Sequence, residues 1–173
     1  MSFSPSSYLN QEILNVPKSG IRKFFDVAQT MPNAISLGVG EPDFITPYHI
    51  RNAAINSILD GETQYTSNWG LLELRQEIAL YMKSRFQLTY DPAKEVLVTV
   101  GASEGIDLAL RILVNSGDEV LVPQPSYVSY APGVVFAGGK AVPVRTDASN
   151  GFALTPEAVL EALTPNTKAI ILP

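Results

Sequence analysis

Residues 96–111 read VLVTVGASEGIDLALR, and two hydrophobic patterns meet there at a glycine. The residues at 96–100 are apolar or β-branched, as is typical of a strand that is buried in a sheet. After Gly101, apolar side chains recur at the spacing of a helix face, for example at Ile106 and Leu110. The stretch therefore predicts a strand, a tight turn and a helix that begins at the turn.

Strand-like and helical patterns continue to alternate as far as Pro173. We expect strands at 96–100, 119–122, 141–144 and 168–172, and helices at about 103–115, 126–137 and 155–163. Short apolar strands that alternate with helices favour an α/β fold, with a mostly parallel sheet and helices on both faces. Ligands of such sheets bind beyond the carboxyl ends of the strands, and the turn at Gly101 lies at such an end.

Composition and charge exclude several classes of protein. At 173 residues, 46% of them hydrophobic, the chain has the size and apolar content of one domain. A formal net charge of −5 and the lack of clustered Lys and Arg argue against a nucleic-acid partner. Without cysteine there are no disulfides and no thiolate metal sites. No apolar run approaches a membrane span and no secretory leader is visible, so we expect a soluble cytoplasmic protein without a membrane partner.

The turn that follows residue 100 has features of an anion site. A helix N-terminus offers N–H groups and a partial positive charge to a phosphate. Gly101 permits a tight turn, and the small Ala102 and Ser103 let a ligand approach the backbone. The sequence matches neither G-x-G-x-x-G nor G-x-x-x-x-G-K-S/T here. An ordinary strand-to-helix turn, with Ser103 as the helix cap, therefore stays open as an alternative.

Five stretches carry a resemblance to a known family. They are SLGVGEPDFITP (36–47), YTSNWGLLELR (65–75), GASEGIDLALR (101–111), GDEVLVPQPSYVSY (117–130) and LTPNTKAIILP (163–173). In this order and at this spacing they resemble the class I/II aminotransferases, the aspartate-aminotransferase-like branch of the fold-type I pyridoxal phosphate enzymes. The resemblance implies an N-terminal arm and small-domain segment at 1–46. It further implies the N-terminal part of the large cofactor-binding domain at 47–173, incomplete at its C-terminal end.

The resemblance also implies pyridoxal 5′-phosphate as the cofactor. The backbone N–H groups of Ala102, Ser103 and Glu104 would hold its phosphate, with the Glu104 side chain turned away. Tyr127 would stack on its pyridine ring, a position that suits a flat apolar face with a polar tip. On the residues alone, Tyr127 is interpreted as a half-buried aromatic in the loop after Pro125.

Two residues nearer the N-terminus gain roles from the same resemblance. Tyr65 would reach from one subunit of a homodimer to the phosphate held by the other, and Gly40 would line the site of the substrate carboxylate. On the residues alone, Tyr65 is interpreted as a surface tyrosine and Gly40 as a turn glycine.

The catalytic residues of the family are expected after Pro173. Transamination needs a lysine that bonds to the cofactor and moves the Cα proton. It also needs an acid beside the pyridine nitrogen and an arginine that holds the substrate carboxylate. In the family all three follow the position that matches Pro173, and none of the six lysines here lies in a Ser-rich turn like that of the family. We therefore expect a non-catalytic N-terminal part of an aminotransferase.

The expected activity is transfer of an amino group from an aromatic or acidic amino acid to a 2-oxo acid such as 2-oxoglutarate. Fold-type I relatives that cleave C–S bonds, decarboxylate or form a cyclopropane share this half of the chain and stay open as alternatives. A regulator that senses the cofactor is disfavoured, because the first 18 residues are too short and too weakly charged for the DNA-binding segment of such regulators. The missing glycine fingerprint disfavours a nucleotide-binding domain.

Overall fold

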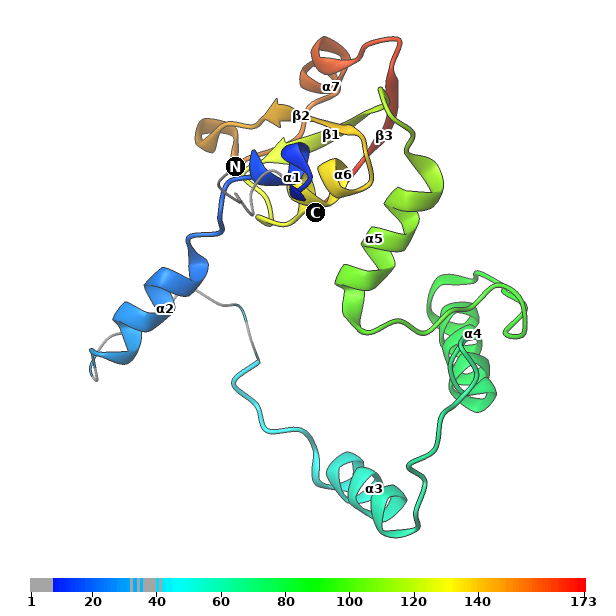
Figure 1. Cartoon of the computed structure of the whole chain (residues 1–173). Helices are drawn as coiled ribbons and strands as arrows, with labels where there is room; N and C mark the ends of the chain where they lie inside the picture. Colours follow the sequence, from blue (N-terminus) through cyan, green and yellow to red (C-terminus); the bar gives the residue numbers. More distant parts are fainter. Residues whose placement is uncertain (1–7, 32, 34, 36–39, 41) are drawn as a thin grey trace. The chain divides into compact units, whose positions relative to one another are not determined.

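The computed structural model describes residues 8–31, 33, 35, 40 and 42–173. The chain forms two compact units, which Figure 1 traces from the N-terminus to the C-terminus. Unit 1 combines Met1–Arg22 with Gly101–Pro173, and unit 2 is Lys23–Val100. The division into small-domain and large-domain parts at residue 46 stays a prediction.

The sheet of unit 1 has three parallel strands in the order β2-β1-β3. They are β1 (Glu119–Gln124), β2 (Lys140–Arg145) and β3 (Thr167–Ile170). The central strand β1 is buried except at its last residue, and it pairs with β2 in unbroken register over its whole length. The strands expected at 119–122 and 141–144 are therefore confirmed, as is the parallel sheet, and the strand expected at 168–172 is present but ends at Ile170.

Helices lie on both sides of this sheet (Figure 1). α6 (Tyr130–Phe136) connects β1 to β2, and α7 (Pro156–Ala162) follows the short 3-10 turn η2 (Ala148–Asn150) and leads to β3. The connection from β1 to β2 and the connection from β2 to β3 run in opposite directions across the sheet. Right-handed connections therefore put α6 and α7 on opposite faces. α5 (Gly101–Leu113) and the short α1 (Gln11–Leu14) both contact α6.

The hydrophobic core of unit 1 lies where α5 and α6 meet one face of β1. Its buried members are Leu110, Val114, Val120, Val122 and Val134. Side chains alternate along a strand, so those at 120 and 122 share this face, whereas the buried side chain at 121 points to the other face. Full burial of such a side chain contributes about 1.5–3 kcal/mol. The cluster therefore fixes β1 against α6, the two elements between which the loop at 125–129 is held.

A side-chain cap marks the start of α7, and a backbone turn precedes α6. Thr155 Oγ1 accepts the N–H of Ala158 at 3.3 Å and a proline opens α7, which confirms the helix expected at 155–163. The helix expected at 126–137 is shorter, because α6 begins only at Tyr130. The residues before it form a turn in which the Tyr127 carbonyl accepts the N–H of Tyr130 at 3.2 Å.

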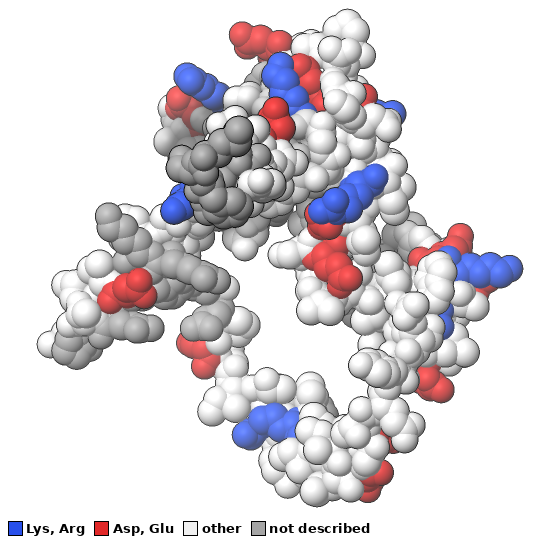
Figure 2. All heavy atoms as spheres, viewed as in Figure 1, with Lys and Arg blue, Asp and Glu red and all other residues white. Residues whose placement is uncertain are grey.

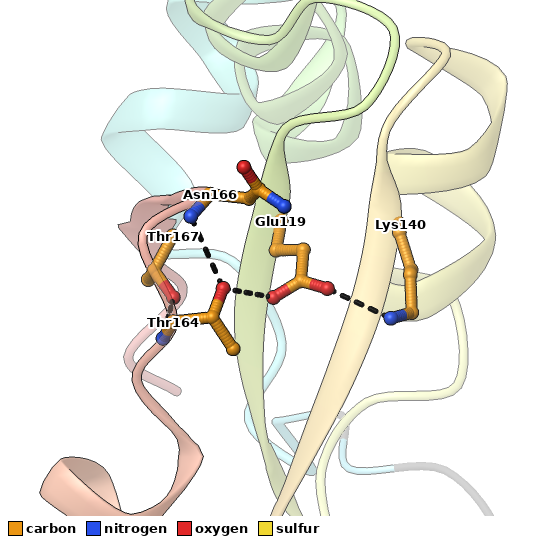
Figure 3. Close-up of polar contacts among 5 residues, drawn as sticks. All are labelled: Glu119, Lys140, Thr164, Asn166 and Thr167. Carbon is orange, nitrogen blue, oxygen red and sulfur yellow. Dashed lines mark hydrogen bonds and ion pairs between the residues drawn. The ribbon is translucent and has the colours of Figure 1, made fainter.

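A polar cluster connects the three strands at their amino ends (Figure 3). Glu119, the buried first residue of β1, accepts a bond from Lys140 Nζ of β2 at 2.7 Å. Its other carboxylate oxygen accepts the hydroxyl of Thr164, just before β3, at 2.6 Å. Both bonds favour the charged carboxylate, so the pKa of Glu119 is lowered, chiefly by the bond from Lys140. The cluster lies at the edge of the sheet opposite to the loop that follows β1.

Unit 2 contains α3 (Tyr48–Leu59), α4 (Leu72–Phe86) and most of α2 (Ile21–Gln29). Arg75 of α4 is buried, and its Nη1 donates to the carbonyl of Pro92 at 2.8 Å. This bond ties the turn around residue 92 to the helix. Within the described residues, no helix has the length and apolar character needed to cross a membrane.

The strand expected at 96–100 is wrong, because no strand is formed there. Val98 instead donates its N–H to the carbonyl of Trp69 at 3.1 Å. Gly70 packs on the same valine so closely that a Cβ on Gly70 would lie 2.7 Å from Val98 Cβ. β-Branched residues favour a strand, but a strand also needs a hydrogen-bonded neighbour. Here the loop at Trp69 occupies the position that a neighbouring strand would take.

Candidate cofactor site

The loop after β1 presents an aromatic ring at the carboxyl edge of the sheet. Tyr127 follows the buried strand by three residues and is 55% exposed. Its ring meets the ring of Tyr130 edge-on, with centroids 5.6 Å apart and planes at 74°. This is the favourable T-shaped arrangement of two aromatic rings, and it leaves the Tyr127 ring available to a ligand.

Tyr127 lines a cavity of about 780 Å³ within unit 1. One wall is the N-terminal segment, with Glu12 and residues 15–20, and the other comes from the end of β1, the following loop and α6. The size is that of a small-molecule site. Its lining residues include apolar ones, such as Val16, Val128 and Phe136, and others with hydroxyl or amide side chains.

The N-terminal wall adds functional candidates that sequence reasoning missed. Lys18 and Glu12 bring one positive and one negative side chain to the cavity that Tyr127 lines. No local pattern could reveal this, because the two walls come from segments about a hundred positions apart in the sequence.

Figure 2 shows acidic and basic side chains interspersed, rather than gathered by sign, on the face turned to the viewer.

The predicted phosphate turn forms the first turn of α5. Gly101 has a φ of +76°, a conformation that glycine adopts without strain, and no atom lies within 4 Å of where a Cβ would stand. Ala102, Ser103 and Glu104 are all exposed. The turn was expected at the end of a strand and at the start of a helix, and of these two only the helix start is formed.

The turn and the cavity are separate features of unit 1. The described residues that line the cavity include Tyr127 but not Ala102, Ser103 or Glu104. Further along α5, Asp107 accepts a bond from Arg111 Nε at 2.7 Å. This pairing raises the pKa of Arg111, chiefly through the hydrogen bond itself.

Gly40 and Tyr65 both belong to unit 2. Tyr65 is fully exposed, and nothing lies within 4 Å of where a Cβ on Gly40 would stand. The neighbouring residues 36–39 and 41 of the same motif lie outside the described residues. The roles of Gly40 and Tyr65 in binding substrate and cofactor stay predictions.

The lysines of unit 1 lie in two different places. Lys140 bonds to Glu119, and Lys168 Nζ lies 4.0 Å from a carboxylate oxygen of Asp118, so both are at the amino edge of the sheet. Lys18 is the lysine among the described cavity residues. Its neighbours Ser19 and Gly20 line the same wall.

The sequence and the fold both match known aminotransferases. The family model described as aminotransferase class I and II matches residues 32–173. The chain therefore belongs to the class I and II aminotransferase family.

Individual relatives share a large part of this chain. It is 49% identical over 167 residues to YugH of Bacillus subtilis (strain 168), a protein named only provisionally as an aminotransferase, and covers 43% of that relative. It is 45% identical over 157 residues to an aspartate aminotransferase of Pyrococcus abyssi, covering 91% of this chain and 40% of that one. An aromatic-amino-acid aminotransferase of Thermococcus litoralis is 42% identical over 95% of this chain, which covers 42% of that relative.

A solved structure gives the same result for the fold. The aspartate aminotransferase of Thermus thermophilus, in a structure with maleate, matches with a TM-score of 0.84 and 33% identity. The match covers 95% of this chain and 44% of the other. The chain thus spans less than half the length of the relatives that it matches.

Proposed function

We propose that the protein is a pyridoxal-phosphate-dependent aminotransferase that moves an amino group from an aromatic or acidic amino acid to a 2-oxo acid such as 2-oxoglutarate. Family membership supports the class of reaction, and the named aspartate and aromatic-amino-acid relatives support the substrate classes. The observation that carries the proposal is the exposed Tyr127 ring on a cavity at the carboxyl edge of a parallel sheet.

Two separate features of unit 1 each suit one part of a phosphorylated aromatic cofactor: the turn at 101–104 suits its phosphate and Tyr127 suits its ring. The first turn of α5 combines a glycine at positive φ with two small exposed residues, Ala102 and Ser103, so that a phosphate can reach the backbone. The thirteen-residue helix behind this turn supplies the favourable dipole. Glu104 lies in the same turn, so its backbone rather than its charged side chain is the part suited to the phosphate.

Tyr127 suits the aromatic ring of the cofactor. A half-exposed tyrosine offers one face to a flat ligand, and its hydroxyl can stay at the polar rim of the cavity. When bound, pyridoxal phosphate supplies an electron sink for the bond that breaks at the amino acid Cα. The part of Tyr127 is to hold the ring plane in one orientation. The cavity walls from residues 15–20 and from α6 would shield a ring stacked on Tyr127 from part of the solvent.

The activity is tested with the whole protein and a panel of amino acids offered with 2-oxoglutarate. We expect glutamate to form with aspartate or with the aromatic amino acids. Products of C–S cleavage or of decarboxylation, without glutamate, would instead identify one of the other fold-type I reactions.

Two variants of Tyr127 test the site itself. Tyr127→Phe keeps the ring and should keep most of the activity, whereas Tyr127→Ala should lose cofactor affinity by about 0.5–1.5 kcal/mol beyond the lost area. Ser103→Ala, which removes one hydroxyl, should cost no more than about 0.5–1.5 kcal/mol. Equal retention of pyridoxal phosphate by the parent and by Tyr127→Ala contradicts the stacking role.

The proposed assembly is a homodimer in the cytoplasm, in which Tyr65 reaches the cofactor phosphate of the partner subunit. The full exposure of Tyr65 supports this role, because the hydroxyl is available to a second chain. Sedimentation of the whole protein tests the dimer. Mixing Tyr65→Phe with a phosphate-turn variant tests the shared site, since only one of the two sites in such a mixed dimer should then be impaired.

A further inference from the structure

Tyr130 contacts the ring that the proposed function assigns to the cofactor. The two rings meet edge-on at 5.6 Å, and the backbone N–H of Tyr130 donates to the carbonyl of Tyr127 at 3.2 Å. Ring and backbone contacts therefore join the same two residues. The hydrogen bond fixes the backbone turn that brings the two residues together, and the ring contact is the one that restricts the Tyr127 side chain.

Unlike Tyr127, Tyr130 is fixed to the core. It opens α6 and packs against the buried cluster that includes Leu110 and Val134. The Tyr127 side chain is 55% exposed, has two rotatable side-chain bonds and stands in a loop. A half-exposed aromatic in such a position is free to change rotamer unless a fixed neighbour holds it.

We propose that Tyr130 is a positioning residue that holds the Tyr127 ring in the orientation needed to stack on the cofactor. The inference rests on the proposed function, and it adds a second aromatic residue to the site. The polarised hydrogens on the edge of one ring are attracted to the face of the other, so the contact fixes a plane as well as a distance. Tyr130 touches neither cofactor nor substrate in this proposal and acts through Tyr127.

The first experiment needs no cofactor. Tyrosine rings labelled with ¹³C report the environment of Tyr127 by NMR, and Tyr127→Phe assigns its signals. In Tyr130→Leu, which keeps apolar volume but removes the ring, the Tyr127 signals should move toward those of a freely rotating tyrosine. Tyr130→Phe keeps the edge contact and should leave them near the parent position. Tyr127 signals that are unchanged in Tyr130→Leu would overturn the inference.

The second experiment measures binding of pyridoxal phosphate by its absorbance in equilibrium dialysis. Tyr130→Leu should weaken retention by about 2- to 12-fold, the range given by the loss of one edge-to-face contact, and Tyr130→Phe should restore it. Tyr81→Leu is the matched control, because Tyr81 makes a similar edge-on contact with Phe86 at 6.0 Å in unit 2. We expect this control to retain pyridoxal phosphate like the parent.

The outcomes distinguish the positioning role of Tyr130 from the stacking role of Tyr127. If Tyr127→Ala weakens binding and Tyr130→Leu does not, the stacking role stands and the role of Tyr130 is overturned. If Tyr127→Ala binds like the parent while the NMR signals of Tyr127 respond to Tyr130→Leu, Tyr130 holds the ring but the proposed cofactor site is wrong.

Discussion

Replacing Gly139 with alanine tests the packing that holds α6, and with it the Tyr127 loop, against the sheet. A Cβ at this position would stand 3.2 Å from the carbonyl oxygen of Asp118, at the same distance from Val134 Cγ1, and closer still to Val114 Cγ1. Both valines are buried, so neither can turn aside freely. Overpacking of this kind costs about 1–3 kcal/mol, and the backbone oxygen places the expected value in the upper half of that range.

The assay is urea unfolding followed by circular dichroism, with an unchanged denaturant slope as the sign that only stability has changed. Gly133→Ala is the control, because it adds the same methyl group inside α6. There the nearest atom is the terminal Leu110 Cδ1 at 3.3 Å, which has to move by only a few tenths of an ångström, and alanine gains up to about 1 kcal/mol of helix propensity. We expect this variant to differ from the parent by less than about 1 kcal/mol. A Gly139→Ala chain as stable as Gly133→Ala refutes the packing argument.

Three further predictions follow from the fold. The pKa of Glu119 is lower in the folded chain than the ordinary value of 4.5, so the unfolded chain binds the proton first as the pH falls. The free energy of unfolding should therefore decrease from about pH 4.5 down through the pKa of the folded state. Comparison of the acid limb of stability with that of Glu119→Gln measures this, and equal slopes would count against the cluster. Arg75→Lys should destabilise by about 1–3 kcal/mol in urea, because lysine lacks the planar fork that reaches the Pro92 carbonyl, and an unchanged midpoint would contradict this. Finally, the 173-residue chain alone should not transfer amino groups faster than free pyridoxal phosphate, and stoichiometric borohydride labelling of Lys18 with turnover would show the opposite.

The elements that sequence patterns predicted correctly are those with local causes. The strand at 119–124 is four buried apolar residues in a row, and Thr155-Pro156 signals the start of a helix by its own chemistry. The run at 96–100 has the same composition as a buried strand, yet it depends on a neighbour that its own residues cannot specify. The strand predicted at 96–100 is therefore not formed.

In the candidate site, too, only the features with local causes could be predicted from the sequence. A half-exposed Tyr127 was predictable, because it follows a buried strand and a proline and precedes a helix. The cavity wall at 15–20 and the contact with Tyr130 were not, since the first joins distant segments and the second is a ring geometry. The bonds from Lys140 and Thr164 to Glu119 are likewise non-local.

The discontinuous make-up of unit 1 has a consequence for how the chain folds during synthesis. Residues 8–22 are made before Lys23–Val100, but the strand and helix that they face are made only after it. At about 5–20 residues per second, that interval lasts on the order of 5–20 s. The central strand β1 is made before β2 and β3, so it has no strand to pair with until they have been made. The N-terminal wall of the Tyr127 cavity is therefore made well before the wall that it faces, and the cavity cannot close until residues 122–136 have been made.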